Sequence, residues 1–168
     1  LAERWRAAAV ALAAGQSPPL ETLLPDLPSE LPIRTSEGFA YYALYPNQYA
    51  EAARAFAAQE RPRRVVCIGI RTIGVALSAV VAATLAAEGC EVCTFTVRPQ
   101  GPPFDRRLAL SIRLGSVLRA EGERGSHFVV VDEGPGMSGS TFNGTANGLR
   151  SEEHTSELQS HLNLVCRL

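Results

Sequence analysis

Apolar residues follow one another along this chain in short segments that change between helical and strand spacing. Residues 1–14 carry apolar positions at helical spacing, and the glycine and prolines that follow them end the helix. Residues 39–45 are aromatic and extended in character, so we expect a strand there. Pro46 suits the first turn of a helix, and an apolar stripe then predicts that this helix runs to about Gln59.

From residue 64 onward, strand-like and helix-like segments alternate regularly. The predicted strands cover residues 64–70, 91–97 and 128–131, and the predicted helices cover residues 75–88 and 105–120, with a last helix from about Gly139. We expect Gly89 to end the first of these helices and Asp105 to cap the second. Such alternation is typical of an α/β fold whose parallel sheet is covered by helices on both faces.

Three chemically unusual loops follow the three predicted strands. They are residues 69–74 with Arg71, residues 98–107 with several arginines, and residues 132–141 with two acids and several small residues. Ligands of open α/β sheets bind outside the carboxyl ends of the strands, where these loops meet. We therefore predict that the three loops form one functional site.

The most informative segment covers residues 129–141, where a buried strand ends in Asp132 and Glu133 and a glycine-rich loop leads into a helix. Backbone N–H groups at a helix start form a cradle for a phosphate, and hydroxyl side chains add donors. The expected phosphate-binding residues are Gly136, Met137, Ser138, Gly139, Ser140 and Thr141. The two acids can accept hydrogen bonds from vicinal ribose hydroxyls or hold Mg²⁺ through water, so the segment predicts a ribose 5-phosphate site.

Other interpretations of this segment stay open. Gly134 and the residues to Thr141 have the spacing of a Walker A loop, but Ser140 stands where that loop has Lys, and the two acids would repel a triphosphate. Residues 136–140 are similar to a nucleophile elbow, but its last glycine is Ser140, and His127 lies at the opposite end of the strand. In a third interpretation the glycines only form a tight turn.

Residues 129–141 are similar to the phosphoribosyl pyrophosphate (PRPP) signature of type I phosphoribosyltransferases, in which a hydrophobic strand, an acidic pair and a short spacer precede a Thr/Ser-Gly-x-Thr motif. The resemblance covers about residues 36–149. It implies that Asp132 and Glu133 contact the ribose hydroxyls and that residues 138–141 bind the 5′-phosphate.

The same resemblance implies roles for the two other loops and a cofactor. The pyrophosphate loop would consist of Ile70, Arg71, Thr72 and Ile73, and residues 98–107 would form the mobile hood over the site. Arg71, Arg106 and Arg107 would then be the catalytic cations, and Mg²⁺ would be held indirectly by Asp132 and Glu133. The implied activity is phosphoribosyl transfer with release of pyrophosphate.

The chain departs from the family pattern at three points. The spacer before Ser138 is one residue longer than usual and contains Pro135. The acid that purine salvage members use as a base is replaced by Gly136 or Met137, and the hood has no Lys, so that Arg106 or Arg107 would have to substitute for it. A non-catalytic domain that senses a nucleotide or PRPP is therefore the alternative function.

Composition and charge narrow the class of ligand. All 16 basic residues are Arg, and the net charge of −1 gives no sign of nucleic-acid or anionic-membrane binding. No apolar run is long enough to span a membrane. The four cysteines contain a single CxxC pair, so we expect small core residues in a reducing compartment rather than a zinc site. We therefore expect a cytoplasmic protein with a small-molecule substrate, and the sequence leaves a homodimer open.

We expect the end of the chain to have a different origin from the rest. Residues 150–161 resemble the conceptual translation of a widely used sequencing adapter, and residues 162–168 would be read-through of the same origin. We expect residues 1–35 to form an N-terminal helix and a proline-rich segment, residues 36–149 to form an incomplete phosphoribosyltransferase-like domain truncated at its C-terminus, and residues 150–168 to be a non-native tail. His154 and His161 are therefore not catalytic candidates.

Overall fold

The computed structural model of the chain describes residues 43–71, 73–134, 138–153 and 162–165, together with a few isolated residues nearer the N-terminus. Those isolated residues are Ala8, Val10, Ala11, Gln16, Ser17, Glu30, Pro32, Ala40 and Tyr41. Ala8, Val10 and Ala11 are helical, in agreement with the helix predicted over residues 1–14, whose other positions lie outside the described residues.

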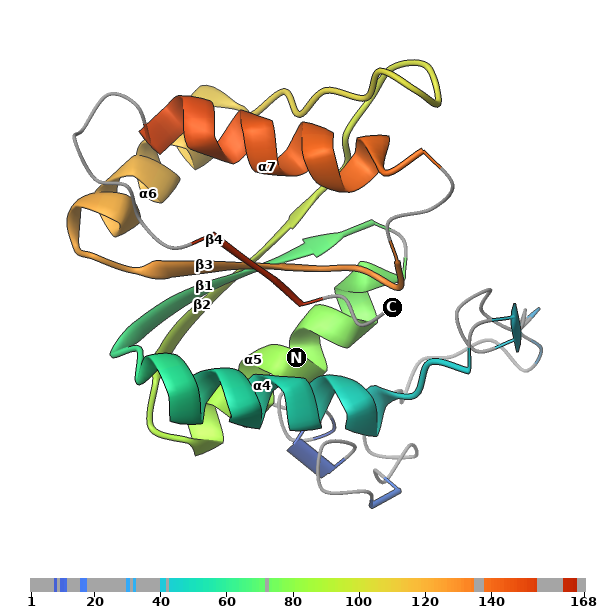
Figure 1. Cartoon of the computed structure of the whole chain (residues 1–168), viewed down its shortest axis with the longest axis vertical. Coiled ribbons are helices and arrows are strands. Elements are labelled where there is room, and N and C mark those ends of the chain that lie inside the picture. Colours follow the sequence, from blue (N-terminus) through green and yellow to red (C-terminus); the bar gives the residue numbers. More distant parts are fainter. Residues whose placement is uncertain are drawn as a thin grey trace.

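The described strands form one parallel sheet with the order β2-β1-β3-β4 (Figure 1). These strands are β1 (Arg64–Ile70), β2 (Glu91–Val97), β3 (His127–Val131) and β4 (Leu162–Val165). β1 pairs with β2 on one side and with β3 on the other. Six of its seven residues are buried, because β1 lies in the interior of the sheet and is covered on both faces.

Helices cover both faces of the sheet (Figure 1). Helices α4 (Pro46–Glu60) and α5 (Gly74–Ala87) lie on one face, and helices α6 (Ile112–Glu123) and α7 (Ser140–Glu153) lie on the other. No helix in the described part of the chain is both long and apolar enough to cross a membrane. The predicted α/β fold with a parallel sheet between two helical layers is confirmed.

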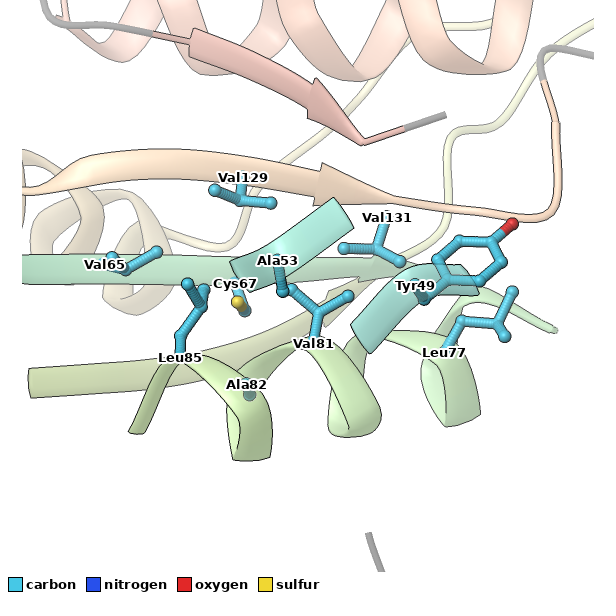
Figure 2. Close-up of a cluster of buried hydrophobic side chains, with 10 residues drawn as sticks. All are labelled: Tyr49, Ala53, Val65, Cys67, Leu77, Val81, Ala82, Leu85, Val129 and Val131. Carbon is cyan, nitrogen blue, oxygen red and sulfur yellow. The ribbon is translucent and has the colours of Figure 1, made fainter. Parts of the chain in front are cut away.

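Successive residues of β1 and β3 point to opposite faces and build two separate cores. On the α4 and α5 side, Val65, Cys67, Val129 and Val131 pack with helix residues such as Leu85 (Figure 2). The core on the α6 and α7 side consists of Val66, Ile68, Ile70, Val97, Leu118, Phe128, Val130, Phe142 and Leu149. The uninterrupted apolar runs in the sequence therefore reflect strands that are buried on both sides.

The predicted element boundaries from residue 46 to residue 97 agree closely with the structure. Pro46 opens α4, and the Gln48 side chain accepts a hydrogen bond of 2.8 Å from the Tyr45 N–H. Strands β1 and β2 have the predicted bounds, and α5 begins one residue before its predicted start. Gly89 follows α5 with a φ of 89°, a backbone conformation that favours glycine.

The strand predicted over residues 39–45 is wrong. Ala40 and Tyr41 are helical, and the three residues from Ala43 have no regular secondary structure. Ala43 has a φ of 50°, which is incompatible with an extended strand. The Tyr41 side chain is 79% exposed, so the aromatic residue on which the prediction depended finds no sheet face to cover.

The predicted start of α6 is also wrong. Asp105 does not cap this helix, because its carboxylate pairs with Arg107 in the loop. The N-cap is Ser111, whose hydroxyl accepts a hydrogen bond from the Leu114 N–H. The intervening chain remains extended, and Leu108 and Leu110 pack against the core on the α6 and α7 side.

The expectation that the cysteines are core residues holds only in part. Cys67 is fully buried, and burial raises the pKa of its thiol to about 12. Cys90 is intermediate in exposure and Cys93 is exposed, because β2 is an edge strand with most of its residues at the surface. The three described cysteines are free thiols, and Cys166 lies outside the described residues.

Two parts of the expected tail, residues 150–153 and 162–165, belong to the described fold. Helix α7 runs to Glu153, and β4 pairs with β3 in the register Phe128 to Leu162. The prediction that residues 150–168 are non-native concerns their origin, and it stays a prediction.

Helix α5 sits closely on the ends of two strands because two glycines leave room for it. A Cβ atom on Gly69 would overlap the hydroxyl of Ser78 and the carbonyl oxygen of Gly74. A Cβ atom on Gly74 would overlap the carbonyl oxygen of Val131, the last residue of β3. The start of α5 is therefore fixed against the carboxyl edge of the sheet.

We expect the substitution Gly69→Ala to lower the free energy of unfolding by about 2 kcal/mol, because the added methyl group overpacks this contact. The control is Gly122→Ala, at a helical position of α6 where a Cβ atom meets nothing within 4 Å. This control should be neutral or stabilising by up to about 1 kcal/mol. Urea unfolding measures both changes, and an equal stability of the two variants would contradict the close approach of α5.

Candidate functional site

The carboxyl ends of the three predicted strands lie at one edge of the sheet. Ile70 pairs in register with Val97, and Gly69 pairs with Val131. Arg71, Arg98 and Asp132, which follow these ends, therefore leave the sheet at the same edge. The three loops therefore begin at one edge of the sheet, and their predicted common functional site stays a prediction.

The end of β3 is held by hydrogen bonds from two helices. The Tyr49 hydroxyl of α4 donates a hydrogen bond of 2.8 Å to the Asp132 carbonyl oxygen, and Figure 2 shows that this hydroxyl lies beside the end of β3. The Asp132 carboxylate accepts a 2.9 Å hydrogen bond from the Glu133 N–H and another from the N–H of Gly74, the first residue of α5. The Asp132 carboxylate therefore faces the N-terminus of α5, which favours a negative charge.

The pKa of Asp132 is raised from its ordinary value of 3.8 to about 6. Burial is the main cause, and the nearby charge of Glu133 acts in the same direction. The hydrogen bonds from the backbone of Glu133 and Gly74 act against this rise. Asp132 is therefore charged at neutral pH and takes up a proton under mildly acidic conditions.

The two serine hydroxyls before and at the start of α7 converge on one backbone atom. The Ser138 hydroxyl donates a hydrogen bond of 2.8 Å to the carbonyl oxygen of Pro103, and the Ser140 hydroxyl donates to the same oxygen. The two hydroxyl oxygens lie 2.9 Å apart. Pro103 belongs to the loop that follows β2, so this loop reaches the start of α7.

The loop after β2, residues 98–107, forms a lobe. Gln100 and Arg107 pair through two backbone hydrogen bonds of 2.8 and 2.9 Å, which close the lobe at its base. Within it, the Arg107 guanidinium lies 3.1 Å from the Asp105 carboxylate. The Arg106 carbonyl lies directly against Gly144 of α7, where a Cβ atom would overlap it. The lobe therefore rests on α7 because Gly144 has no side chain.

A cleft of about 480 Å³ lies between this lobe and α7. It is lined by Phe104, Asp105, Arg106, Arg107, Leu108, Ser138, Ser140, Asn143, Gly144, Asn147, Gly148 and Ser151. Neither Asp132 nor Glu133 is among the lining residues. The cleft is therefore lined by Ser138 and Ser140, whereas the Asp132 carboxylate faces α5 instead.

The expected cationic residues are distributed over two places. Arg106 and Arg107 line the cleft. Arg71 is exposed, and its Nε donates a hydrogen bond of 3.3 Å to the Thr96 hydroxyl near the end of β2. Arg106 and Arg107 therefore line the same cleft as Ser138 and Ser140. The Arg71 side chain instead contacts the edge strand β2.

The other expected site residues also have definite places. Ile70 is buried at the end of β1, and Ile73 is the N-cap of α5. Gly139 has a φ of 63°, and its carbonyl accepts the hydrogen bond from the Asn143 N–H in the first turn of α7. Thr141 is the second residue of α7. Thr72, Gly136 and Met137 lie outside the described residues.

Two participants were missed by the sequence analysis, and a third, Gly74, was included only as the last residue of the loop 69–74. Tyr49 was recognised only as part of the apolar stripe of α4, and its sequence context gives no sign of a bond to Asp132. The Pro103 carbonyl is a backbone group without any sequence signature. Gly74 directly follows the expected pyrophosphate loop, and its position between that loop and an apolar helix is a signal that could have been used.

Comparison with solved structures finds chains that are similar to this one. The crystal structure of hypoxanthine-guanine phosphoribosyltransferase from L. donovani is similar to this chain with a TM-score of 0.49 and 18% sequence identity, over 72% of this chain and 69% of that one. No protein-family model and no curated protein sequence matches the chain. What the chain binds is therefore inferred from its own residues.

The raised pKa of Asp132 predicts how stability depends on pH. The folded state holds the proton more tightly than the unfolded state, so the free energy of unfolding should fall as the pH rises through the window from 3.8 to about 6. Asp132→Asn keeps the hydrogen-bond acceptor without the charge. We expect this variant to exceed the wild type in stability by on the order of 2 kcal/mol near pH 8, and by little near pH 4.

The measurement is urea unfolding of both proteins across this pH range. The control is Glu51→Gln, which removes a carboxylate at an exposed position of α4, away from the end of β3. A constant difference between wild type and Asp132→Asn at all pH values would contradict the burial of a charged Asp132.

We expect Tyr49→Phe to lower the free energy of unfolding by about 1–2 kcal/mol, because the Asp132 carbonyl loses its hydroxyl donor in a partly buried place. Tyr41→Phe, at a side chain that is 79% exposed, serves as the matched control and should leave stability unchanged. Thermal or urea unfolding measures both. An equally small effect of the two substitutions would show that the hydroxyl of Tyr49 does not hold the end of β3.

Proposed function

We propose that this protein is of the phosphoribosyltransferase type, binding Mg²⁺-PRPP or a ribose 5-phosphate nucleotide and transferring the phosphoribosyl group with release of pyrophosphate. The observation that carries the proposal is the order of groups after β3. Two acids leave the carboxyl edge of the parallel sheet, and Ser138 and Ser140 follow in the same connection at the start of α7. Carboxylates can accept hydrogen bonds from the two hydroxyls of a ribose, and a helix N-terminus with hydroxyl donors can bind a phosphate.

The proposed division of roles follows the geometry. The N–H groups at the start of α7 and the hydroxyls of Ser138 and Ser140 bind the 5′-phosphate, assisted by Arg106 in the neighbouring cleft. Glu133 accepts hydrogen bonds from the ribose hydroxyls. The Asp132 carboxylate accepts hydrogen bonds from the backbone N–H groups of Gly74 and Glu133. Its main role is therefore to fix the position of Glu133 relative to α5.

Phosphoribosyl transfer breaks the bond between the ribose C1 and a pyrophosphate oxygen and forms a bond from C1 to the acceptor. The transition state carries positive charge on the ribose, so catalysis rests on positioning and on stabilising the leaving pyrophosphate. Arg71, one residue beyond β1, would supply positive charge to the pyrophosphate. Asp132 and Glu133 would hold Mg²⁺ through water, where the ion neutralises phosphate charge.

The alternative is a non-catalytic domain that senses a nucleotide or PRPP. Two observations favour it: no acid stands directly before Ser138, and the hood contains no Lys. Binding of the ligand would then require the same phosphate and ribose contacts but no group that removes a proton from an acceptor.

The test has two measurements on the purified protein. Pyrophosphate release from PRPP is followed with a panel of nucleobases, and binding of PRPP and ribose 5-phosphate is titrated with and without Mg²⁺. Release supports the transferase, and Mg²⁺-dependent binding without release supports the sensor. Tight binding of ATP with no affinity for either ribose phosphate would contradict both.

We expect Glu133→Gln to weaken binding of ribose 5-phosphate by about tenfold or more, because hydrogen bonds from the diol to a charged acceptor are lost. Binding of inorganic phosphate should not change, because the phosphate contacts are elsewhere. Glu123→Gln at the exposed end of α6 is the matched control. Isothermal titration gives both affinities, and an equal loss for ribose 5-phosphate and phosphate would contradict the role of Glu133.

A further inference from the structure

The donors proposed for the phosphate are already bonded to the chain itself. The hydroxyls of Ser138 and Ser140 both donate to the carbonyl oxygen of Pro103. A phosphate oxygen accepts hydrogen bonds from hydroxyl groups in the same manner. The Pro103 carbonyl oxygen therefore accepts the hydrogen bonds that one oxygen of a bound phosphate would accept.

We propose that residues 101–105 form a latch, which closes the phosphate site through Pro103 and opens when a phosphate monoester displaces it. The inference rests on the proposed function and adds a regulation of the same site. Ser140 is only 8% exposed, so its hydroxyl needs a partner in the absence of ligand. The latch supplies this partner and, for the same reason, competes with the ligand.

The balance between the two partners follows from charge. A carbonyl is a neutral acceptor, whereas a phosphate is an anion, and hydrogen bonds to an ionised acceptor are about twice as strong. Phosphate also gains the attraction of the N-terminus of α7 and of Arg106, which lines the adjoining cleft. Phosphate should therefore displace the latch, with an affinity reduced by the fraction of molecules in which the latch is closed.

The contacts of the latch define how it can move. The pair of Gln100 and Arg107 closes its base, and an ion pair from Asp105 to Arg107 lies within it. It rests on α7 at Gly144, which the Arg106 carbonyl contacts directly. A methyl group at Gly144 therefore pushes the latch away without altering either serine.

The decisive variant is Gly144→Ala, and its control is Gly122→Ala, where a new Cβ atom meets nothing within 4 Å. Ribose 5-phosphate and inorganic phosphate are titrated separately into each protein by calorimetry. If the latch is open in about one molecule in ten, Gly144→Ala should bind both ligands about tenfold more tightly than the wild type, and Gly122→Ala should bind like the wild type.

A second variant covers the case in which Gly144→Ala does not fold. Residues 101–105 are replaced by Asn-Gly, because a short hairpin loop that keeps Arg106 can still connect the backbone pair of Gln100 and Arg107. This chain lacks Pro103 and should show the same gain in affinity for both ligands. Circular dichroism confirms that each variant is folded.

Amide hydrogen exchange follows the latch itself. The Asp105 N–H donates to the Pro102 carbonyl within the latch, and its exchange should become faster when ribose 5-phosphate saturates the wild type. Unchanged exchange together with equal affinities in all variants overturns the latch and leaves the proposed function intact. Absence of ribose 5-phosphate binding in the wild type and in every latch variant overturns the proposed function and the latch with it.

Discussion

The end of β3 is the point on which the rest of the candidate site depends. There the Tyr49 hydroxyl fixes the Asp132 carbonyl, and the N–H of Gly74 fixes the Asp132 carboxylate. Helices α4 and α5 therefore both contact the chain at Asp132, directly after β3. The carboxylate remains charged at neutral pH despite its burial because backbone N–H groups and a helix N-terminus face it. This arrangement fixes the direction in which Glu133 and the following loop leave the sheet.

The parts of the fold that could be predicted are those in which local preference and burial agree. β1 and β3 have uninterrupted apolar runs because the sheet buries both of their faces, and Gly89 ends α5 because the turn there has a positive φ. Prediction failed at residues 39–45, where aromatic content suggested a strand, and at Asp105, where a favoured capping residue suggested a helix start. In both cases the tertiary surroundings, which the sequence does not show, decided the structure. The residue types at the carboxyl edge could be predicted, but the bond from Pro103 could not, because any residue offers the same carbonyl group.

The structure divides the polar residues of the segment 129–141 between two neighbourhoods. Asp132 faces the start of α5, while Ser138 and Ser140 face the lobe after β2 and the cleft beside α7. This division is consistent with a ligand that has two polar ends, because an acid and a hydroxyl cradle recognise different groups. Glu133 lies in the sequence between the two, which is why the proposed function assigns the contact with the sugar to this acid.

A site whose donors are bonded internally avoids leaving buried hydroxyls without partners, but every ligand must first break those bonds. For an enzyme, opening of the lobe would have to alternate with closure over the substrate in each turnover. For a sensor, the same opening would itself be the output, because the lobe carries the exposed side chains of Phe104 and Asp105 to a new place. The hydrogen bonds from Ser138 and Ser140 to Pro103 therefore suit either function. In an enzyme, phosphate binding would serve the transfer to the acceptor, whereas in a sensor it would serve to move the lobe.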